Sequence, residues 1–553
     1  MVDRYSSEIL GVVKPLEWDG GVTPATLHIG LFGGLYLDPD NLSAPPIHYQ
    51  GCVKSDVLFK KKIGIAFWRE KSGIDFGFLD IALEDQSDEF IEFGRNTTVC
   101  SVELYRVNLG SPTEDQLEIL ATAQCSDVGF NDEFTLRLRL ESILQGGFDA
   151  PINELYYDYT YPHLAGRPYP IAWGQITDPY QVLPTIEVDP TTLTYHVTDL
   201  EIDSFESYVY DSGIELAQET PFLQFTPVDY GFVLNQNPFG RITCGRILLN
   251  DPYGATGEHM HGLFRFFRLA MTRAGIWSYA NETELTQLET DINFGDLFPQ
   301  YFTHDVVSLE TFMGDILGGV TGWYHTDELS EIHFGRMVDP DVQSGIAYNF
   351  TDSEVTGKIR VEDDKAPGLS SRLSYAQNPG AYTDEEIAAG VYAENRVHFK
   401  TEFRVVVTGG YLEELQWTAD DDTWTADDVI HTADGFAGYN FVEPSVNVYW
   451  KKTQIANPII IHLPYYGGSP NAFDLAQQEV DRWWSELYYK RRRFYTFSVK
   501  LNDEQFNTTK IQLGDFCTLQ SDRFKLLNIP KNLFIRRMEQ NYSKNLLTIE
   551  GWG

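Results

Sequence analysis

The sequence predicts a mainly β protein, a β-rich α+β fold with several barrel or sandwich domains. The first observation is aromatic content: the 553 residues include 35 Phe and 31 Tyr, side chains that pack well on pleated, half-buried sheets. The second is pattern, because apolar residues alternate in short runs and helical spacing is confined to a few segments. The third is length, which exceeds the roughly 250 to 300 residues of a single core, so three or four domains are expected.

The clearest strand pattern lies in the N-terminal part of the chain. Between Glu133 and Leu140, the apolar residues alternate with polar ones, which is the period of a sheet with one face in water. The apolar set is Phe134, Leu136, Leu138 and Leu140, and the polar set is Thr135, Arg137 and Arg139. Similar strands are predicted over 63–68, 74–83 and 98–107. We expect an antiparallel barrel or sandwich here.

Three segments show helical spacing instead. Residues 263–274 form an amphipathic pattern, and residues 305–317 form a second one with Thr303 as its expected N-cap. The buried stripe predicted for the second helix is Val306, Leu309, Phe312, Met313, Ile316 and Leu317. A third helix is predicted over 472–492. Its basic C-terminal end, 490–493, suits the helix dipole, with docking on an acidic neighbour as the alternative.

These elements divide the chain into four predicted regions. Residues 1–165 form an N-terminal β domain, and 166–255 a second β-rich region. Residues 256–400 form an inserted α+β domain, and 401–553 a C-terminal β-barrel domain that contains the helix 472–492. The boundaries fall at Pro- and Gly-containing turns, where chains commonly change direction.

The charge disfavours nucleic acid as a tightly held partner. The formal net charge is −40, from 81 acidic and 41 basic residues, and this balance repels phosphate. The segment 479–553 differs, because its 13 Lys and Arg against 9 Asp and Glu give +4 and leave −44 for the rest. One end of the molecule should therefore be electrically distinct.

Neither the cysteines nor the N-terminus indicates an exported or membrane protein. The thiols are widely spaced without a CxxC pair, so no zinc knuckle or disulfide framework is predicted; they are Cys52, Cys100, Cys125, Cys244 and Cys517. The start MVDRYSSEIL lacks the basic and apolar parts of a signal peptide. Apolar runs are too short for a membrane span, so we expect no span.

A short internal repeat occupies residues 417–437, where WTADDDT, WTADDVI and HTADGFA follow one another. A seven-residue unit is far shorter than a solenoid repeat, so a surface loop or ribbon is expected. Its carboxylates offer a calcium site as an alternative, although an EF-hand pattern is missing. The candidate ligands are Asp420, Asp421, Asp422, Asp427 and Asp428.

The sequence offers no catalytic constellation. It contains no GxSxG, GxxxxGK[ST], GxGxxG after a strand, or HExxH motif. His259 and His261 could join a third ligand around a metal, but capping of the helix that follows is the competing interpretation. Paired carboxylates are too abundant to single out one glycosidase pair. We predict no catalytic residue and no cofactor, and therefore a protein that is not an enzyme.

Two segments resemble the tail hub proteins of long-tailed bacteriophages. The first is LAGRPYPIAWG at 164–174, followed by VYDSG at 209–213; the second runs from IQLGDFCTL at 511–519 through DRFKL to LTIEGWG at 547–553. Between them, 359–367 and 373–379 fit the same order. The family-motif residues are Gly166, Arg167, Pro170, Gly174, Tyr210, Gly213, Gly514, Asp515, Arg523, Phe524 and Trp552. Lys525 departs from the glycine that is usual there.

The resemblance implies a baseplate hub in the virion, assembled in the host cytoplasm. Its first and last regions would be tube-like β domains in a homotrimeric ring. The C-terminal segment would supply a strand, a turn, a strand and the closing strand of a small barrel. The implied partners are the tail tube and distal tail protein, the tape measure protein, and central fibre or tip proteins. DNA would pass through without being held, so an acidic bore is expected, with general surface solubility as the competing explanation of the charge.

Two other functions remain open. A receptor- or glycan-binding tail protein would use aromatic side chains to stack on polysaccharide, and it would carry separate sugar sites on its outer surface. A hub that also degrades the cell wall would digest peptidoglycan when purified. Large apolar faces between subunits would favour the structural hub over both.

Overall fold

The structure is a computed structural model of the whole chain. The residues it describes are 7–19, 23–36, 46–54, 57–63, 72–83, 88–108, 117–132, 134–174, 181–204, 208–217, 224–245, 247–255, 258–260, 262–292, 297–343, 345–363, 370–375, 377–401, 404–409, 459–463, 466–468, 478–479, 481–482, 487, 492–500, 511–542 and 544–553.

The N-terminal part forms an eight-stranded sheet in the order β3-β4-β2-β1-β8-β9-β10-β7. The strands are β1 Ser7–Trp18, β2 Leu27–Gly30, β3 Gly34–Tyr36, β4 Ile47–Gly51, β7 Phe78–Ala82, β8 Thr97–Asn108, β9 Leu117–Asp132 and β10 Thr135–Glu141. The predicted alternation holds for Leu136, Leu138 and Leu140 of β10, which are buried, but it is wrong at the start, where Phe134 is exposed and Thr135 is buried. Helix α1, Asp88–Asn96, adds buried Phe90 and Phe93.

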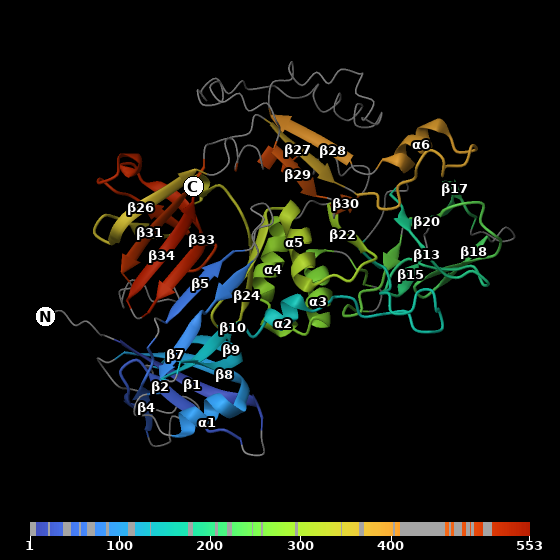
Figure 1. Cartoon of the computed structure of the whole chain (residues 1–553). Helices are drawn as coiled ribbons and strands as arrows, with labels where there is room; N and C mark the ends of the chain where they lie inside the picture. Colours follow the sequence, from blue (N-terminus) through green and yellow to red (C-terminus); the bar gives the residue numbers. More distant parts are fainter. Residues whose placement is uncertain are drawn as a thin grey trace.

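A second large sheet gathers strands from the C-terminal half in the order β25-β32-β33-β34-β31-β26. They are β25 Ile346–Phe350, β26 Val355–Asp363, β31 Arg493–Lys500, β32 Phe516–Leu519, β33 Lys531–Asn541 and β34 Leu546–Trp552. Strand β33 has a register shift between Ile535 and Arg537 in its pairing with β34. Beyond the shift its other edge pairs with an N-terminal hairpin, β5 Leu58–Lys62 and β6 Gly73–Asp75, which Figure 1 shows reaching up to the red sheet.

Helices occupy the centre of the molecule (Figure 1). They are α2 Gln145–Asp149, α3 Leu263–Arg273, α4 Glu282–Asp291 and α5 Leu309–Gly319, beside the hairpin β23 Gly322–Thr326 and β24 Ile332–Arg336. A short sheet of β11 Ile171–Gly174, β22 Leu297–Thr303 and β30 Tyr466–Gly468 lies with them. The core packs around Phe312, whose ring meets those of Trp173, Phe267 and Tyr301 at 4.9 to 5.8 Å between centroids.

The two central helices follow their predicted stripes with one correction. Helix α3 buries Leu263, Phe266 and Phe267 as expected. Helix α5 begins later than predicted, because the side chain of Ser308 accepts the hydrogen bond from Thr311 N and is the N-cap. Thr303 instead ends β22, and its hydroxyl accepts from Asp305 N. Val306, placed in the stripe by its spacing, therefore precedes the helix and is exposed.

Small sheets extend from the centre toward the right of Figure 1. One contains β12 Leu183–Pro184, β20 Ile242–Gly245, β16 Tyr208–Asp211 and β17 Ile214–Glu215; another contains β13 Ile186–Asp189, β14 Thr194–His196, β19 Gly231–Leu234 and β18 Phe225–Val228. Further elements are β15 Ile202–Ser204 with β21 Leu248–Leu249, the sheet of β27 Ser370–Tyr375, β28 Arg404–Gly409 and β29 Ile459–Leu463, and α6 Ala393–Lys400. Short 3-10 turns are η3 Trp277–Tyr279, η4 Pro340–Val342 and η7 Lys525–Leu527.

The predicted β-rich α+β class is confirmed, but the expected closed barrels are not found. Within the described ranges, the strand pairings leave every sheet open, although an isolated bridge links Val53 to Ile81 in edge strand β7. Most of the predicted helix 472–492 lies outside the described residues. The four-region division stays a prediction. Among the described helices, none is long and apolar enough to cross a membrane.

Candidate functional site

A cluster of buried polar side chains surrounds the β23–β24 hairpin. The strands pair so that His325 lies opposite His333, and their rings stack with 4.9 Å between centroids. The ring of Trp323 also stacks on that of His325, with 5.8 Å between centroids. The alternation of side chains along both strands therefore places a row of aromatic rings on one face of the hairpin.

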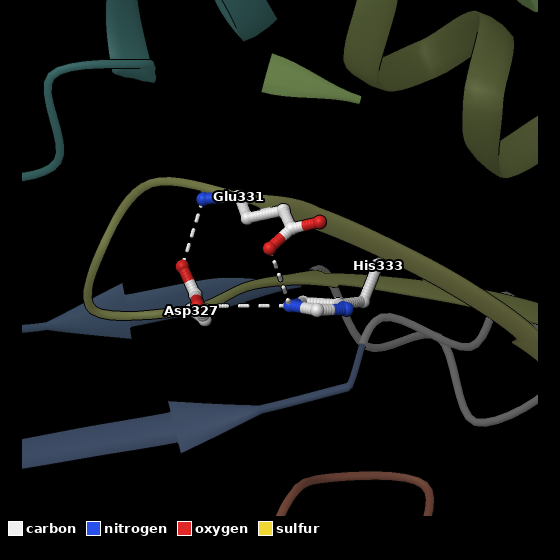
Figure 2. A group of neighbouring side chains, drawn as sticks. All are labelled: Asp327, Glu331 and His333. Carbon is white, nitrogen blue, oxygen red and sulfur yellow. Dashed lines mark hydrogen bonds and ion pairs between the residues drawn. The ribbon is translucent and has the colours of Figure 1, made fainter. Parts of the chain in front are cut away.

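The loop of the hairpin folds around one carboxylate. Asp327 Oδ1 accepts hydrogen bonds from Leu329 N at 2.9 Å and Glu331 N at 2.7 Å. Ser330 completes the turn in the left-handed region, with φ of 68°. These bonds occupy Oδ1 and leave Oδ2 beside the ring of His333, as Figure 2 shows.

His333 is held from two sides and is only 8% exposed. Its Nδ1 lies 3.1 Å from both oxygens of Glu284, and Glu284 Oε2 also accepts from Phe334 N at 3.0 Å. Its Nε2 faces Asp327 Oδ2 at 3.6 Å and Glu331 Oε2 at 4.0 Å (Figure 2). Three carboxylates therefore surround one imidazole.

Helix α4 positions two of these carboxylates. Its N-cap, Asn281, accepts a hydrogen bond from Glu284 N at 3.0 Å, which fixes the first turn. The same side chain donates from Nδ2 to Glu331 Oε1 at 2.8 Å. This bond occupies Oε1 and leaves Oε2 of Glu331 directed at the histidine.

The cluster lies where distant parts of the chain meet. Lys61, from β5, is buried and forms an ion pair with Glu328 of the hairpin loop at 2.6 Å. Thr122 N of β9 donates to the carbonyl of Glu328 at 2.9 Å. On the C-terminal side, the ring of Trp323 lies 6.2 Å from that of Phe534 in β33, measured between centroids. The hairpin thus contacts both large sheets.

The electrostatics of the two histidines are opposite. Burial, together with the charges of His333 and Lys61, lowers the pKa of His325 to about 3. Burial also disfavours charge on His333, but the carboxylates of Asp327 and Glu284 outweigh it and raise the pKa of His333 to about 10. The cluster can therefore hold a positive charge at His333 while His325 stays neutral.

The family-motif residues of the first segment take up turns and close contacts in the middle of the molecule. Gly166 has φ of 79°, while Arg167 is exposed and Pro170 is buried. Gly174 has φ of 106°, and a Cβ there would lie 2.5 Å from Pro299 O. In the second part of the motif, buried Tyr210 packs edge-on against Phe399 at 5.1 Å, and Gly213, with φ of 80°, turns β16 into β17.

The motif residues of the C-terminal segment surround the second large sheet. Gly514 has φ of 90°, and Asp515 accepts from Gln512 N at 2.8 Å. Arg523 pairs with Asp352 at 2.7 Å, and Phe524 is partly exposed. Trp552 is buried beneath the guanidinium of Arg492, which lies 5.1 Å from its ring.

The structure does not gather the family-motif residues into one site, and sequence reasoning missed the cluster around His333. Glu284 is 49 positions away from His333, a separation that no local motif reveals. The spacing of Asp327, Glu331 and His333 was the available signal in the sequence.

The metal-ligand candidates from the sequence are not brought together in the described part of the chain. His259 forms an isolated β-bridge with Asn250, and His261 lies outside the described residues, as do all the calcium candidates in 417–437. All five cysteines are buried free thiols.

The fold defines a β-rich α+β protein in which two large sheets join through a helical centre. No family model and no curated protein sequence matches the chain. It is similar to a solved 43 kDa tail protein of prophage MuSo2 from Shewanella oneidensis, at 11% identity over 99% of this chain and 98% of that one, with a TM-score of 0.36. A prophage tail protein, gp18 from Listeria monocytogenes EGD-e, matches at 9% identity over 90% and 94%, with a TM-score of 0.26. A Francisella PdpA-VgrG complex, half-lidded, matches at 9% over 99% and 58%, with a TM-score of 0.31.

Proposed function

We propose that the chain is a non-enzymatic structural subunit of a phage-type tail, a baseplate hub protein that assembles into a ring. The observation that carries the proposal is the C-terminal sheet. Strands β32, β33 and β34 pair antiparallel in chain order, from the turn at Gly514 and Asp515 to Trp552. This is the strand, turn, strand and closing strand that the tail-hub resemblance implies for the same residues.

The sheet also joins the two ends of the chain, which supports a structural role. Strand β33 pairs with β32, β34 and β5, so one strand connects the C-terminal sheet with the N-terminal hairpin. Buried Phe59 of β5 packs edge-on against Tyr542, which follows β33, at 5.3 Å. Side chains from the two parts of the chain share a core, which supports a role in shape and contact area.

A loop with exposed apolar side chains supports assembly with a neighbour. We define the loop patch as Val342, Phe524, Leu526 and Ile529. Ile529 is 74% exposed and Val342 is 69% exposed, and the ion pair of Lys531 with Asp341 brings η4 to the start of β33. Apolar side chains that share one exposed region are typical of contact surfaces between proteins.

The proposed ring is a homotrimer in the tail tip of the virion, assembled in the host cytoplasm. Its proposed partners are the tail tube and distal tail protein, the tape measure protein, and the central fibre or tip proteins. The net charge of −40 supports a bore through which DNA passes without binding, because each Lys or Arg on phosphate would add affinity.

The mass of the purified full-length protein in solution tests the ring. We expect three times the chain mass of 63.0 kDa by sedimentation or light scattering. Ile529→Glu should shift the mass toward the monomer, since it places a charge in the loop patch, whereas Val306→Glu, at another exposed aliphatic position, should leave it unchanged. A monomeric wild-type protein would contradict the ring.

Imaging intact particles tests the location. Density for this chain around the distal end of the tail channel is expected, with Asp and Glu lining the bore. A bore lined by Lys and Arg would remove the explanation of the charge, and absence of the chain from tails would remove the tail role.

A further inference from the structure

We propose that Asp327, Glu331 and His333 bind one divalent transition-metal cation, a class for which Zn²⁺ is the probe. The site does not depend on the proposed tail function. Its candidate ligand atoms, one imidazole nitrogen and one oxygen from each carboxylate, all lie within 4.8 Å of one another. Figure 2 shows the three side chains converging from the loop and from β24.

The first argument is a buried nitrogen that makes no hydrogen bond. His333 Nε2 belongs to a side chain that is 8% exposed, yet it has no hydrogen-bond partner. Its separations of 3.6 Å from Asp327 and 4.0 Å from Glu331 exceed the roughly 2.7 to 3.2 Å of an N–H···O bond. A buried polar atom left in this way costs free energy, so an occupant between it and the two carboxylates would stabilise the fold.

The second argument is the orientation of the imidazole. Glu284 lies against Nδ1 with both oxygens at 3.1 Å, and a carboxylate there accepts a hydrogen bond from Nδ1–H. A metal ion that displaces the proton from Nε2 meets a lone pair that points toward Asp327 and Glu331. Metal-binding histidines commonly have such a carboxylate on the other ring nitrogen, because it fixes the tautomer and raises the basicity of the ligand.

The ligand spacing is slightly wider than a bound ion requires. Zn²⁺ bonds of about 2.0 to 2.2 Å in a tetrahedron place ligand atoms roughly 3.4 Å apart. The observed 3.6 and 4.0 Å therefore need a small contraction. Glu331 can supply it, because its side chain is 48% exposed, and this exposure also gives the ion a path from solvent.

The charge around the site favours a dication. Four carboxylates lie on or against the hairpin loop: Glu284, Asp327, Glu328 and Glu331. Lys61 neutralises Glu328, which leaves three carboxylates facing one histidine. A dication between Nε2 and the two loop carboxylates offsets more of this charge than one proton does.

The donor set selects the class of metal. Ca²⁺ and Mg²⁺ prefer oxygen ligands alone, whereas an imidazole nitrogen with carboxylate oxygens suits Zn²⁺ and its first-row neighbours. Three protein ligands leave a position for water. The bound ion would tie the loop to β24 and, through Glu284 and Asn281, to α4.

The test is calorimetric titration of the full-length protein with Zn²⁺ after removal of metal, with Co²⁺ absorption as a second readout. We expect saturable binding of Zn²⁺ and a visible Co²⁺ band that Zn²⁺ displaces. Glu331→Gln keeps an oxygen for Asn281 but removes the charged ligand, so it should weaken binding at least about tenfold. Glu282→Gln makes the same change in charge on the exposed face of α4 and should leave affinity unchanged.

A rise in melting temperature with Zn²⁺ provides an independent measure. The wild-type protein and Glu282→Gln should show it, and Glu331→Gln should lose most of it. Absence of saturable binding would overturn the site and leave His333 as a proton-bearing partner of its carboxylates. Equal affinity in wild type and Glu331→Gln would overturn it as well, by placing the ion elsewhere.

Discussion

Gly174 and Gly166 have the same sign of φ but different surroundings. Gly174 ends β11 against β22, where a Cβ would lie 2.5 Å from Pro299 O, whereas a Cβ at Gly166 would meet no atom within 4 Å. Both positions therefore disfavour a side chain through the backbone. Only Gly174 adds a collision with a neighbouring strand.

We predict that Gly174→Ala destabilises the protein more than Gly166→Ala. The left-handed backbone costs alanine about 1 to 2 kcal/mol at either position, and the overlap at Gly174 adds about 1 to 3 kcal/mol. Urea unfolding followed by tryptophan fluorescence measures the difference. An equal loss in the free energy of unfolding for the two variants would mean that β11 and β22 separate enough to accommodate the added Cβ at no cost in free energy.

His196 should make the protein sensitive to acid. It stacks against Tyr157 with 5.7 Å between ring centroids, and burial lowers its pKa from 6.5 to about 4. As pH falls below 6.5 the unfolded chain takes up the proton first. The free energy of unfolding should therefore decline between about pH 6.5 and 4, by roughly 3 kcal/mol, and the loss is complete below both pKa values.

Unfolding across this pH range, in wild type and His196→Phe, measures that contribution. The variant should show a shallower decline, because it has no proton to take up at this position. His163→Phe removes an exposed histidine and serves as control. Parallel curves for wild type and His196→Phe would contradict the assignment.

Among the strands, the pairing of β5 with β33 links the two large sheets, so we expect the sheets to unfold together. Phe59 of β5 is fully buried between Phe76, at 5.2 Å, and Tyr542. Lys61, two residues further along β5, forms an ion pair with Glu328 of the β23–β24 loop. A single short strand therefore touches the N-terminal core, the C-terminal sheet and the β23–β24 hairpin.

Phe59→Ala should loosen both sheets. Removing a buried aromatic side chain costs about 3 to 5 kcal/mol, and we expect faster amide hydrogen exchange in β33 as well as in β8. Phe78→Ala, which removes an exposed ring from β7, should cost about 1 kcal/mol or less. Faster exchange confined to the N-terminal sheet would show that the two sheets open independently.

In the molecule as a whole, net charge affects which partners bind, whereas the fold determines where the contact surfaces lie. The surplus of acidic residues limits which partners bind, but it does not determine the fold. The two open sheets and the helical centre position the loop patch and the β23–β24 hairpin. The proposed ring depends on the position of the loop patch, because its apolar side chains come from two separate segments of the chain.

Local sequence pattern alone predicts the β-rich class, the stripe of α3 and the stripe of α5 from Leu309 onward. These features rest on periodicity and turn chemistry, which act between residues a few positions apart. The predicted start of α5 was wrong because Thr303 and Ser308 both suit an N-cap by residue type, whereas in the structure Thr303 ends β22 and Ser308 caps the helix. The pairing of β5 with β33 and the contact of Glu284 with His333 arise only in the folded chain. Such contacts join residues far apart in the chain, and they follow from which surfaces bury together, which local patterns do not encode.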